Sequence, residues 1–277
     1  MLGPVSICNV FIRRFRLVAV LLVVVAAMGT RCRGEIILYE DSVSQLPGDQ
    51  PWMTYGSNSL LTGGVASQTS VPGIGVTLTT DRAVSAGYSN HTLLGSLKNA
   101  AFPVLDRNSG YSVGFELKVN SESHSSEHRS GFSATVIGHD LRGIELGFWT
   151  DRIWAQSQTP LFSHAEETLF DTSLKEVTYR LAFLGNSYTL FGDNVQLLTG
   201  SLRDYSAFGN PPYTLPNFLF FGDNTSQAAA SVTLGNLSVS TVPEPNALSG
   251  AVMLTAGLLL TLVVRRRSSR NAAIRSL

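Results

Sequence analysis

Cysteine is nearly absent from this sequence, which has 277 residues and only two cysteines, Cys8 and Cys32, both near the N-terminus. This excludes a disulfide framework, so a folded body must rely on its hydrophobic core and its strand pairing. Charged residues are sparse as well, at 14%. Residues 35–241 hold 10 basic and 19 acidic side chains. Because phosphate binding needs Lys and Arg on the contact face, this balance argues against a nucleic-acid partner.

Helical periodicity is also missing from residues 35–241, where apolar and polar residues alternate instead. Phosphate-binding loops, dinucleotide fingerprints and a Ser-His-Asp motif are absent from the chain. The stretch "YSVGFELKVN" places five apolar side chains on one face of a strand: Tyr111, Val113, Phe115, Leu117 and Val119. "GFSATVIG" alternates in the same way. Such alternation predicts antiparallel sheets with one face on the core.

Turn residues divide the second half of this region into short strands. Residues 144–148 and 153–155 predict two strands joined by a turn at Thr150-Asp151. Residues 175–200 predict three strands, separated by turns at Gly185-Asn186 and Gly192-Asp193-Asn194. "SVTLGNLSVS" predicts a closing strand that is broken or bulged at Gly235-Asn236. The sequence therefore predicts an all-β fold, an antiparallel two-sheet sandwich over residues 35–241.

The N-terminus has the layout of an export signal. Arg13, Arg14 and Arg16 precede an unbroken apolar run from Leu17 to Met28, followed by small residues. The run is short for a bilayer span and suits the apolar core of a signal peptide. Residues 1–34 are therefore predicted to be a signal peptide. Cleavage before Thr30 and cleavage before Glu35 both fit, and an uncleaved anchor helix is the alternative.

The C-terminus has the layout of a single membrane span. Residues 247–264 carry no charge, and as a helix they would be about 27 Å long, close to the hydrocarbon thickness of a bilayer. Three arginines follow as a stop, Arg265, Arg266 and Arg267, within a basic tail over residues 265–277. By the positive-inside rule this tail stays cytoplasmic and the body lies on the other side of the inner membrane.

The segment before this span completes a known arrangement. Pro243, Glu244 and Pro245 stand directly ahead of it, and the prolines hold the chain extended, out of the helix. The order of motif, span and basic stop over residues 242–277 closely resembles the PEP-CTERM sorting signal of bacterial surface proteins. The resemblance implies export through the secretory translocon and recognition by an exosortase. It also implies a Gram-negative-type bacterium that makes extracellular polysaccharide.

The body has a resemblance of its own. "GIELGFWTDRIWAQ", "YTLFGDNVQLLTGSLRDYS" and "NFLFFGDNTSQAAASVTLGNLSVS" resemble the concanavalin-like, laminin-G-like sandwich found ahead of such signals, sometimes called a choice-of-anchor domain. The resemblance covers the part after Gly110 well and the part before it poorly. It implies a jelly-roll of two packed sheets, and it carries no catalytic residues over to this chain.

Acidic side chains do not form a hydrolytic pattern. Related sandwiches that hydrolyse glycosides place their acids on one strand as Glu-x-Asp-x-x-Glu, and no such string occurs here. Glu145 comes nearest, but Asp140 is an odd number of residues away, so on one continuous strand the two would face opposite sides. The adjacent pair Glu166-Glu167 has the same consequence. Solvated surface acids are the expectation, and no catalytic residue is predicted.

Metal binding has only weak candidates. His124 and His128 are four residues apart, which suits zinc on a helix, but the serine-rich string "SESHSSEHRS" favours a solvated loop. Asp193 and Asp223, each followed by an asparagine, could offer oxygens to calcium at a sandwich rim. Turn chemistry alone also explains them. We therefore predict no cofactor, with calcium as the alternative.

Aromatic side chains supply the one hint of a ligand site. Trp149 and Trp154 flank the predicted turn, and Tyr213 lies in a proline-rich segment. Exposed aromatic rings can stack on sugar rings, although the same rings can also cap a core. The expected protein is thus an exported, non-catalytic surface or matrix component that binds polysaccharide through these rings. The alternatives are a secreted enzyme acting on glycans and a purely structural envelope protein.

Overall fold

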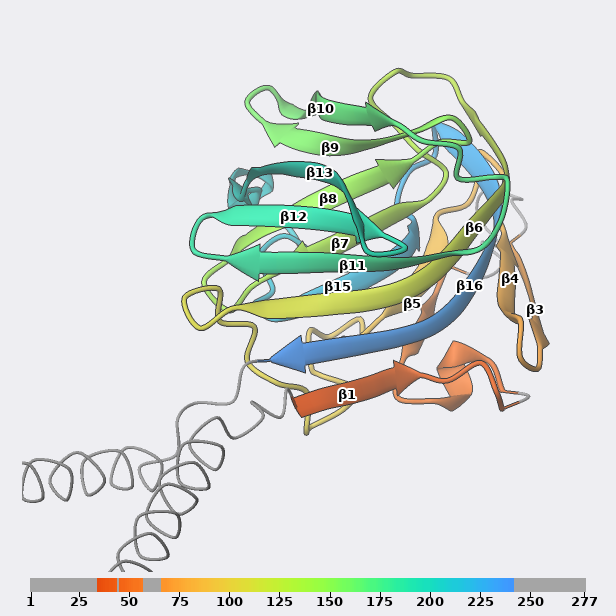
Figure 1. The fold of residues 1–277 in the computed structure, drawn as a ribbon, viewed down its shortest axis with the longest axis horizontal. Helices are drawn as coiled ribbons and strands as arrows, with labels where there is room; N and C mark the ends of the chain where they lie inside the picture. The colour runs from red at the N-terminus through yellow and green to blue at the C-terminus, as the bar shows by residue number, and fades with distance from the viewer. Residues whose placement is uncertain (1–33, 44, 57–65, 242–277) are drawn as a thin grey trace, which may run out of the picture. The chain divides into compact units, whose positions relative to one another are not determined.

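Two antiparallel β-sheets lie face to face in this protein (Figure 1). The computed structural model describes residues 34–43, 45–56 and 66–241. The sorting motif, the predicted span with its basic tail, and the predicted signal peptide except for Gly34 lie outside the described residues. Within those residues, we find no helix with the length and apolarity needed to cross a membrane. The predicted all-β, two-sheet antiparallel sandwich is confirmed.

Sheet A has eight strands among the described residues, in the order β13-β12-β11-β6-β16-β4-β3, with β1 paired to β16. Its long central strands β6 and β16 pair along most of their length. The strand bounds are β1 (Gly34–Tyr39), β3 (Ser67–Val71), β4 (Gly75–Thr79), β6 (Tyr111–His124), β11 (Val177–Leu184), β12 (Ser187–Gly192), β13 (Val195–Ser201) and β16 (Ala228–Thr241).

Sheet B also has eight strands among the described residues, in the order β10-β9-β8-β7-β15-β5-β2, with β14 paired to β8. Two three-residue 3-10 turns, η1 (Pro47–Asp49) and η2 (Ser206–Phe208), complete the elements of this part of the chain. The strand bounds are β2 (Met53–Tyr55), β5 (Ala86–Ser89), β7 (Ser133–Ile137), β8 (Arg142–Phe148), β9 (Arg152–Gln158), β10 (Leu161–Leu169), β14 (Arg203–Asp204) and β15 (Phe218–Asp223).

The core forms where the inner faces of the two sheets meet. The five alternating side chains of β6 are all buried, as predicted: Tyr111, Val113, Phe115, Leu117 and Val119. Phe115 reaches across to sheet B, where its ring lies 6.0 Å from that of Phe148 and 5.2 Å from that of Phe221. Fully burying a side chain of this size contributes roughly 1.5–3 kcal/mol. Such contacts hold the sandwich together without disulfides.

The predicted turns and strands after Gly110 are confirmed. Residues 149–151 join β8 to β9, and β11, β12 and β13 form the three strands expected over residues 175–200. The closing strand β16 changes register between Leu234 and Leu237, so the predicted bulge at Gly235-Asn236 is present. Residues before Gly110, where the resemblance is poor, contribute β1 to β5 to both sheets.

Candidate functional site

A single row of directly opposed residues crosses the outer face of sheet B. The row runs from β2 to β8 through Met53, Ser89, Phe220, Thr135 and Glu145. Opposed residues on neighbouring strands project to the same face of a sheet. All five line a pocket of about 520 Å³. This row, drawn from five strands, and Gln156 of the neighbouring strand β9 together form the floor of the pocket.

An irregular segment covers this face and makes it a pocket. Residues 203–217, here called the strap, begin with β14, which pairs with β8. The Tyr205 hydroxyl donates to the carbonyl oxygen of Gln156 at 2.9 Å and accepts from the backbone N–H of Glu145 at 3.3 Å. The Tyr213 hydroxyl donates to the Glu145 carboxylate. Two tyrosines of the strap thus attach it to β8 and β9.

Glu145 lies at the centre of the site and is only 1% exposed. Its Oε2 accepts the hydrogen bond from Tyr213, and its Oε1 accepts one from the Asn224 side-chain amide at 2.9 Å. Burial raises the pKa of Glu145, and these two hydrogen bonds oppose the rise. The expectation that the acids are solvated is wrong for this residue. Alternation does place Glu145 on the outer face, but the strap excludes water from it.

Two further polar groups on the floor have no hydrogen-bond partner among the described residues. They are the hydroxyl of Thr135 and the side-chain oxygen of Gln156. Thr135 is 1% exposed and Gln156 is 4% exposed. The amide nitrogen of Gln156 is used, since it donates to the His128 carbonyl oxygen at 3.3 Å. Buried polar groups are normally paired, so unpartnered ones in a pocket lining indicate a place where a ligand or ordered water binds.

The walls of the pocket are mainly apolar. The strap supplies Phe208, Pro211, Pro212, Tyr213 and Leu215. His91 and Phe218 also line the pocket; their rings lie 5.7 Å apart, and Nδ1 of His91 lies 2.8 Å from the side-chain oxygen of Asn90. Burial lowers the pKa of His91 and so favours its neutral form. Aromatic walls over a floor with a few polar groups are typical of small-molecule sites.

Trp154 does not present the exposed ring that the sequence suggested. Its side chain is 0% exposed, and its ring lies over Gly147 of β8, where an added Cβ would approach ring atom Cε2 to 2.7 Å. The His164 ring covers the other side, stacked at 4.3 Å with an interplanar angle of 14°. Trp154 is thus enclosed between a glycine and an imidazole and offers no free face to a sugar.

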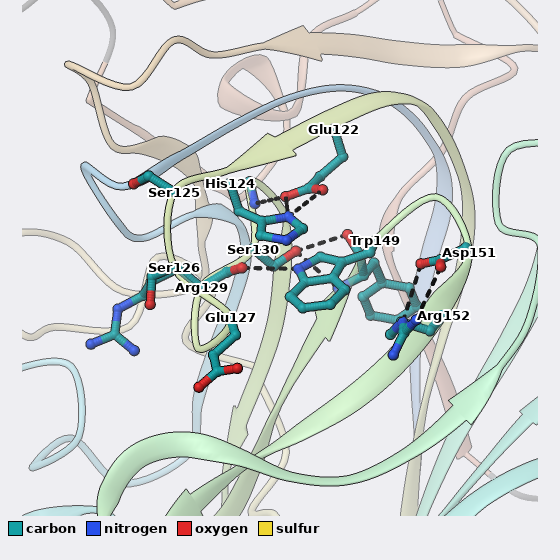
Figure 2. A network of polar contacts seen from close by, with 12 residues as sticks. Glu122, His124, Ser125, Ser126, Glu127, Arg129, Ser130, Trp149, Asp151 and Arg152 are labelled. Atoms are coloured by element: carbon teal, nitrogen blue, oxygen red, sulfur yellow. Dashed lines mark hydrogen bonds and ion pairs between the residues drawn. The ribbon is translucent and has the colours of Figure 1, made fainter.

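Trp149 is covered in a similar way, as Figure 2 shows. It is 8% exposed, the His124 ring stacks on it at 3.9 Å and 9°, and its indole N–H donates to the Arg129 carbonyl oxygen at 2.9 Å. The guanidinium of Arg152 lies 5.4 Å from the ring centroid. Neither tryptophan is part of the pocket lining. Tyr213, the third predicted residue, is 6% exposed and does line the pocket.

Of the two histidines of the serine-rich string, His124 lies outside the expected loop, whereas His128 lies in the loop that follows β6, with a side chain 41% exposed. His124 is the last residue of β6, and its Nδ1 lies 3.0 Å from Oε2 of Glu122. Nδ1 of His128 accepts a hydrogen bond from the backbone N–H of His164 at 3.2 Å. Strand pairing with β16 continues through His124, and this pairing overrides the local preference of the serines for a loop.

The calcium candidates lie in different sheets and have protein partners. Asp193, in the turn between β12 and β13, accepts from the ammonium group of Lys175 at 2.5 Å. Asp223, at the end of β15, accepts from the Thr80 hydroxyl at 2.8 Å and from the Thr225 backbone N–H at 3.0 Å. Across the part of the chain that is described, no group of three or more His, Cys, Asp or Glu residues is arranged to hold a metal ion.

The remaining singled-out acids form ion pairs away from the pocket lining. Asp140 pairs with Arg107 at 2.7 Å. Glu166 of β10 accepts from the Tyr188 hydroxyl at 2.8 Å and pairs with Arg203 at 2.5 Å. Its neighbour Glu167 pairs instead with Arg152 and lies 2.8 Å from Nε2 of His164. None of these acids joins Glu145 in the lining of the pocket.

Comparison with known proteins shows a likeness of fold. No family model and no curated protein matches the chain. A carbohydrate esterase from the Shiga toxin-encoding bacteriophage phi24B is 16% identical, with a TM-score of 0.50 over 76% of this chain and 100% of that one. A Bacillus subtilis protein of unknown function with a galectin-like fold is 9% identical, with a TM-score of 0.43 over 76% and 97% of the two chains. The Bacillus subtilis carbohydrate-binding module CBM66 is 11% identical, with a TM-score of 0.36 over 69% and 96%.

Several residues of the pocket were not singled out by the sequence. Thr135, Gln156 and Arg129 carry no motif, and each belongs to a stretch that looks ordinary by itself. The sequence offers Asn224 only as a calcium candidate beside Asp223, whereas in the structure its side-chain amide donates to Glu145. The available signal was the outward face of each strand, given by alternation, but not the register that brings those faces together.

Proposed function

We propose that the pocket on the outer face of sheet B binds carbohydrate, and that the chain is a non-catalytic, exported polysaccharide-binding protein. The carrying observation is the pair of buried, unpartnered polar groups on the floor, the Thr135 hydroxyl and the Gln156 side-chain oxygen, beneath aromatic walls. A sugar residue matches this pattern, because it combines hydroxyl groups that donate and accept with apolar C–H faces that pack on rings.

The fold is compatible with this proposal but does not carry it. The carbohydrate esterase, at 16% identity, shares the sandwich, and at that identity the likeness extends to the fold alone. The proposal of carbohydrate binding therefore depends on the pocket itself. The walls contributed by the strap belong to this chain's own geometry, as do the unpartnered groups of its floor.

A non-catalytic role is favoured by the number of acids in the pocket. Glycoside hydrolysis ordinarily uses two carboxyl groups, about 5–9.5 Å apart. Among the described residues lining the pocket, Glu145 is the one carboxylate. A glycan-active enzyme is the second candidate, and the observation in its favour is that burial raises the pKa of Glu145, as a general acid requires. Steady release of reducing sugar or acid from a bound polysaccharide would establish that second candidate.

Binding is tested with the purified full chain on an array of oligosaccharides, followed by calorimetry with the oligosaccharides that bind. Thr135→Val removes the hydroxyl and keeps the shape. We expect it to weaken binding roughly 3- to 10-fold, the effect of one hydrogen bond, while stability holds or rises because the lost hydroxyl has no partner in the folded chain. Thr189→Val on β12 of sheet A is the matched control. Absence of binding to any oligosaccharide would favour a structural envelope protein instead.

Export and sorting form the second part of the proposal and rest on the sequence. The predicted signal peptide over residues 1–34 leads into the translocon, and Pro243, Glu244 and Pro245 present the tail to an exosortase beside the inner membrane. The mature protein then reaches the cell surface or the extracellular matrix. Replacing both Pro243 and Pro245 by alanine is expected to leave the tail attached. The mass of the protein recovered from an exosortase-bearing host measures this, and an unchanged mature mass would refute the sorting proposal.

A further inference from the structure

The pocket contains one negative and one positive side chain. Among its described lining residues, Glu145 is the only acid and Arg129 is the only Lys or Arg. His91 and Tyr213 do not alter this balance, because burial lowers the pKa of His91 and raises that of Tyr213, which favours the neutral form of both. The formal charge of the pocket is therefore zero when Glu145 is ionised.

Arg129 is held in place by backbone contacts. Its Nη1 donates to the carbonyl oxygens of His128 at 2.7 Å and Phe162 at 2.8 Å. Neither Arg129 nor Glu145 belongs to an ion pair with another residue in the described part of the chain. The positive charge of Arg129 acts on Glu145 at longer range and lowers the pKa of the Glu145 carboxyl, against the larger effect of burial. Glu145 and Arg129 are therefore the two opposite charges of the described lining.

The free groups of the floor define what a ligand must supply. The Gln156 oxygen can only accept a hydrogen bond, whereas the Thr135 hydroxyl can donate or accept. A ligand hydroxyl satisfies both. A carboxylate satisfies neither the acceptor nor the charge balance. It cannot donate a hydrogen bond to the Gln156 oxygen, and with Glu145 ionised it would leave the pocket and its ligand with one net negative charge. An unpaired charge taken out of water is costly.

We propose, resting on the carbohydrate-binding function above, that the pocket selects an uncharged sugar residue through its hydroxyl groups. Glu145 and Arg129 set this selection by balancing each other's charge. Acidic sugars such as uronates are excluded while Glu145 is ionised. Sugars carrying a free amine are excluded while Arg129 is present.

The test uses the full chain and three oligosaccharide probes of equal length, in both the gluco and the galacto series. One probe is neutral, one carries a uronate and one carries a free amine. We expect wild type to bind a neutral probe at least tenfold more tightly than the uronate and the amine of the same series. Preference for the uronate or the amine, with binding retained, overturns the selection but leaves the carbohydrate-binding function standing. No binding to any probe, together with no binding to the array of oligosaccharides, refutes that function itself.

Two variants test the charge balance. Glu145→Gln keeps the shape of the side chain and leaves Arg129 unbalanced, so the uronate-to-neutral affinity ratio should rise about tenfold. Arg129→Gln leaves Glu145 unbalanced, so the amine-to-neutral ratio should rise instead. Near-ultraviolet circular dichroism identifies any variant that does not fold. In that case the affinity ratio measured with the other variant tests the charge balance. Ratios that stay at the wild-type value in a folded variant contradict the role given to these two residues.

Discussion

The hydroxyl of Tyr213 donates a hydrogen bond to the buried carboxylate of Glu145, and this contact joins the strap to the floor of the pocket. The side-chain amide of Asn224 lies beside both groups, 2.9 Å from Oε1 of Glu145 and 3.3 Å from the Tyr213 oxygen. The strap therefore buries an acid and provides one of the donors that this acid needs, while Asn224, directly after β15, provides the other. The pocket and its lid are held by the same few hydrogen bonds.

Tyr213→Phe is expected to destabilise the folded chain. The substitution keeps the ring but leaves Oε2 of Glu145 without its donor, and an unsatisfied buried acceptor costs about 1–3 kcal/mol, more when it is charged. Urea unfolding followed by circular dichroism measures the free energy of unfolding. Tyr55→Phe is the control, because Tyr55 also lines the pocket but is 40% exposed, and it should change that free energy by less than about 0.5 kcal/mol. Equal effects of the two variants would contradict this account.

Gly147→Ala is expected to disturb the enclosure of Trp154. An added Cβ would meet ring atom Cε2 of Trp154 at 2.7 Å, so the indole must shift toward the stacked His164. Overpacking of this kind costs about 1–3 kcal/mol. Thermal unfolding measures the loss, and the fluorescence of the tryptophans reports a changed environment. Ser187 is an exposed residue at the start of β12, so Ser187→Ala should leave both readouts unchanged. A Gly147→Ala protein as stable as the Ser187→Ala protein would refute the contact.

The sequence predicts those parts of the fold whose signals are local. Alternation at β6 identifies the buried face, and Gly185-Asn186 and Gly192-Asp193-Asn194 mark the two turns between β11 and β13. Each of these features depends on neighbours within a few residues. A strand with one buried face, and a turn that needs small or amide side chains, leave such a pattern whatever surrounds them.

The pocket depends on relationships that leave no local pattern. Phe220 of β15 lies between Ser89 and Thr135, on strands from distant parts of the chain, and their register follows from the whole sheet. Alternation places Glu145 on the outer face, but its burial depends on the strap, an irregular segment without periodicity. The covering of Trp149 and Trp154 likewise depends on His124 and His164, which the sequence does not link to them.

Asp223→Asn is expected to remove a pH dependence of stability. Burial raises the pKa of Asp223 from 3.8 to about 8. The folded chain therefore holds this proton more tightly than the unfolded chain. The contribution of Asp223 to the free energy of unfolding is greatest at pH values below the pKa that Asp223 has in the unfolded chain. This contribution falls as the pH rises toward about 8, by up to about 1.4 kcal/mol per pH unit.

The measurement is urea unfolding of wild type and Asp223→Asn at pH values from about 4 to about 9. The variant also changes the hydrogen bonds with Thr80 and Thr225, which shifts its stability by an amount that does not follow pH. The difference between the two proteins is therefore the informative quantity, and it should move in favour of the variant as pH rises. Parallel curves over the whole range would show that Asp223 titrates as an ordinary surface acid.

Phe208→Ala is expected to weaken the binding of neutral oligosaccharides. Phe208 lies on η2 of the strap, lines the pocket and is 45% exposed, and its ring packs edge-on against those of Phe162 and Tyr213. An aromatic ring at the mouth of a sugar site gives a flat apolar face, and losing such a contact costs about 0.5–1.5 kcal/mol. We therefore expect neutral oligosaccharides to bind roughly 2- to 12-fold more weakly in calorimetry. Leu174→Ala is the control, since Leu174 is also exposed but does not line the pocket, and it should leave binding unchanged. If Phe208→Ala bound as tightly as Leu174→Ala, the strap would not form a wall of the binding site.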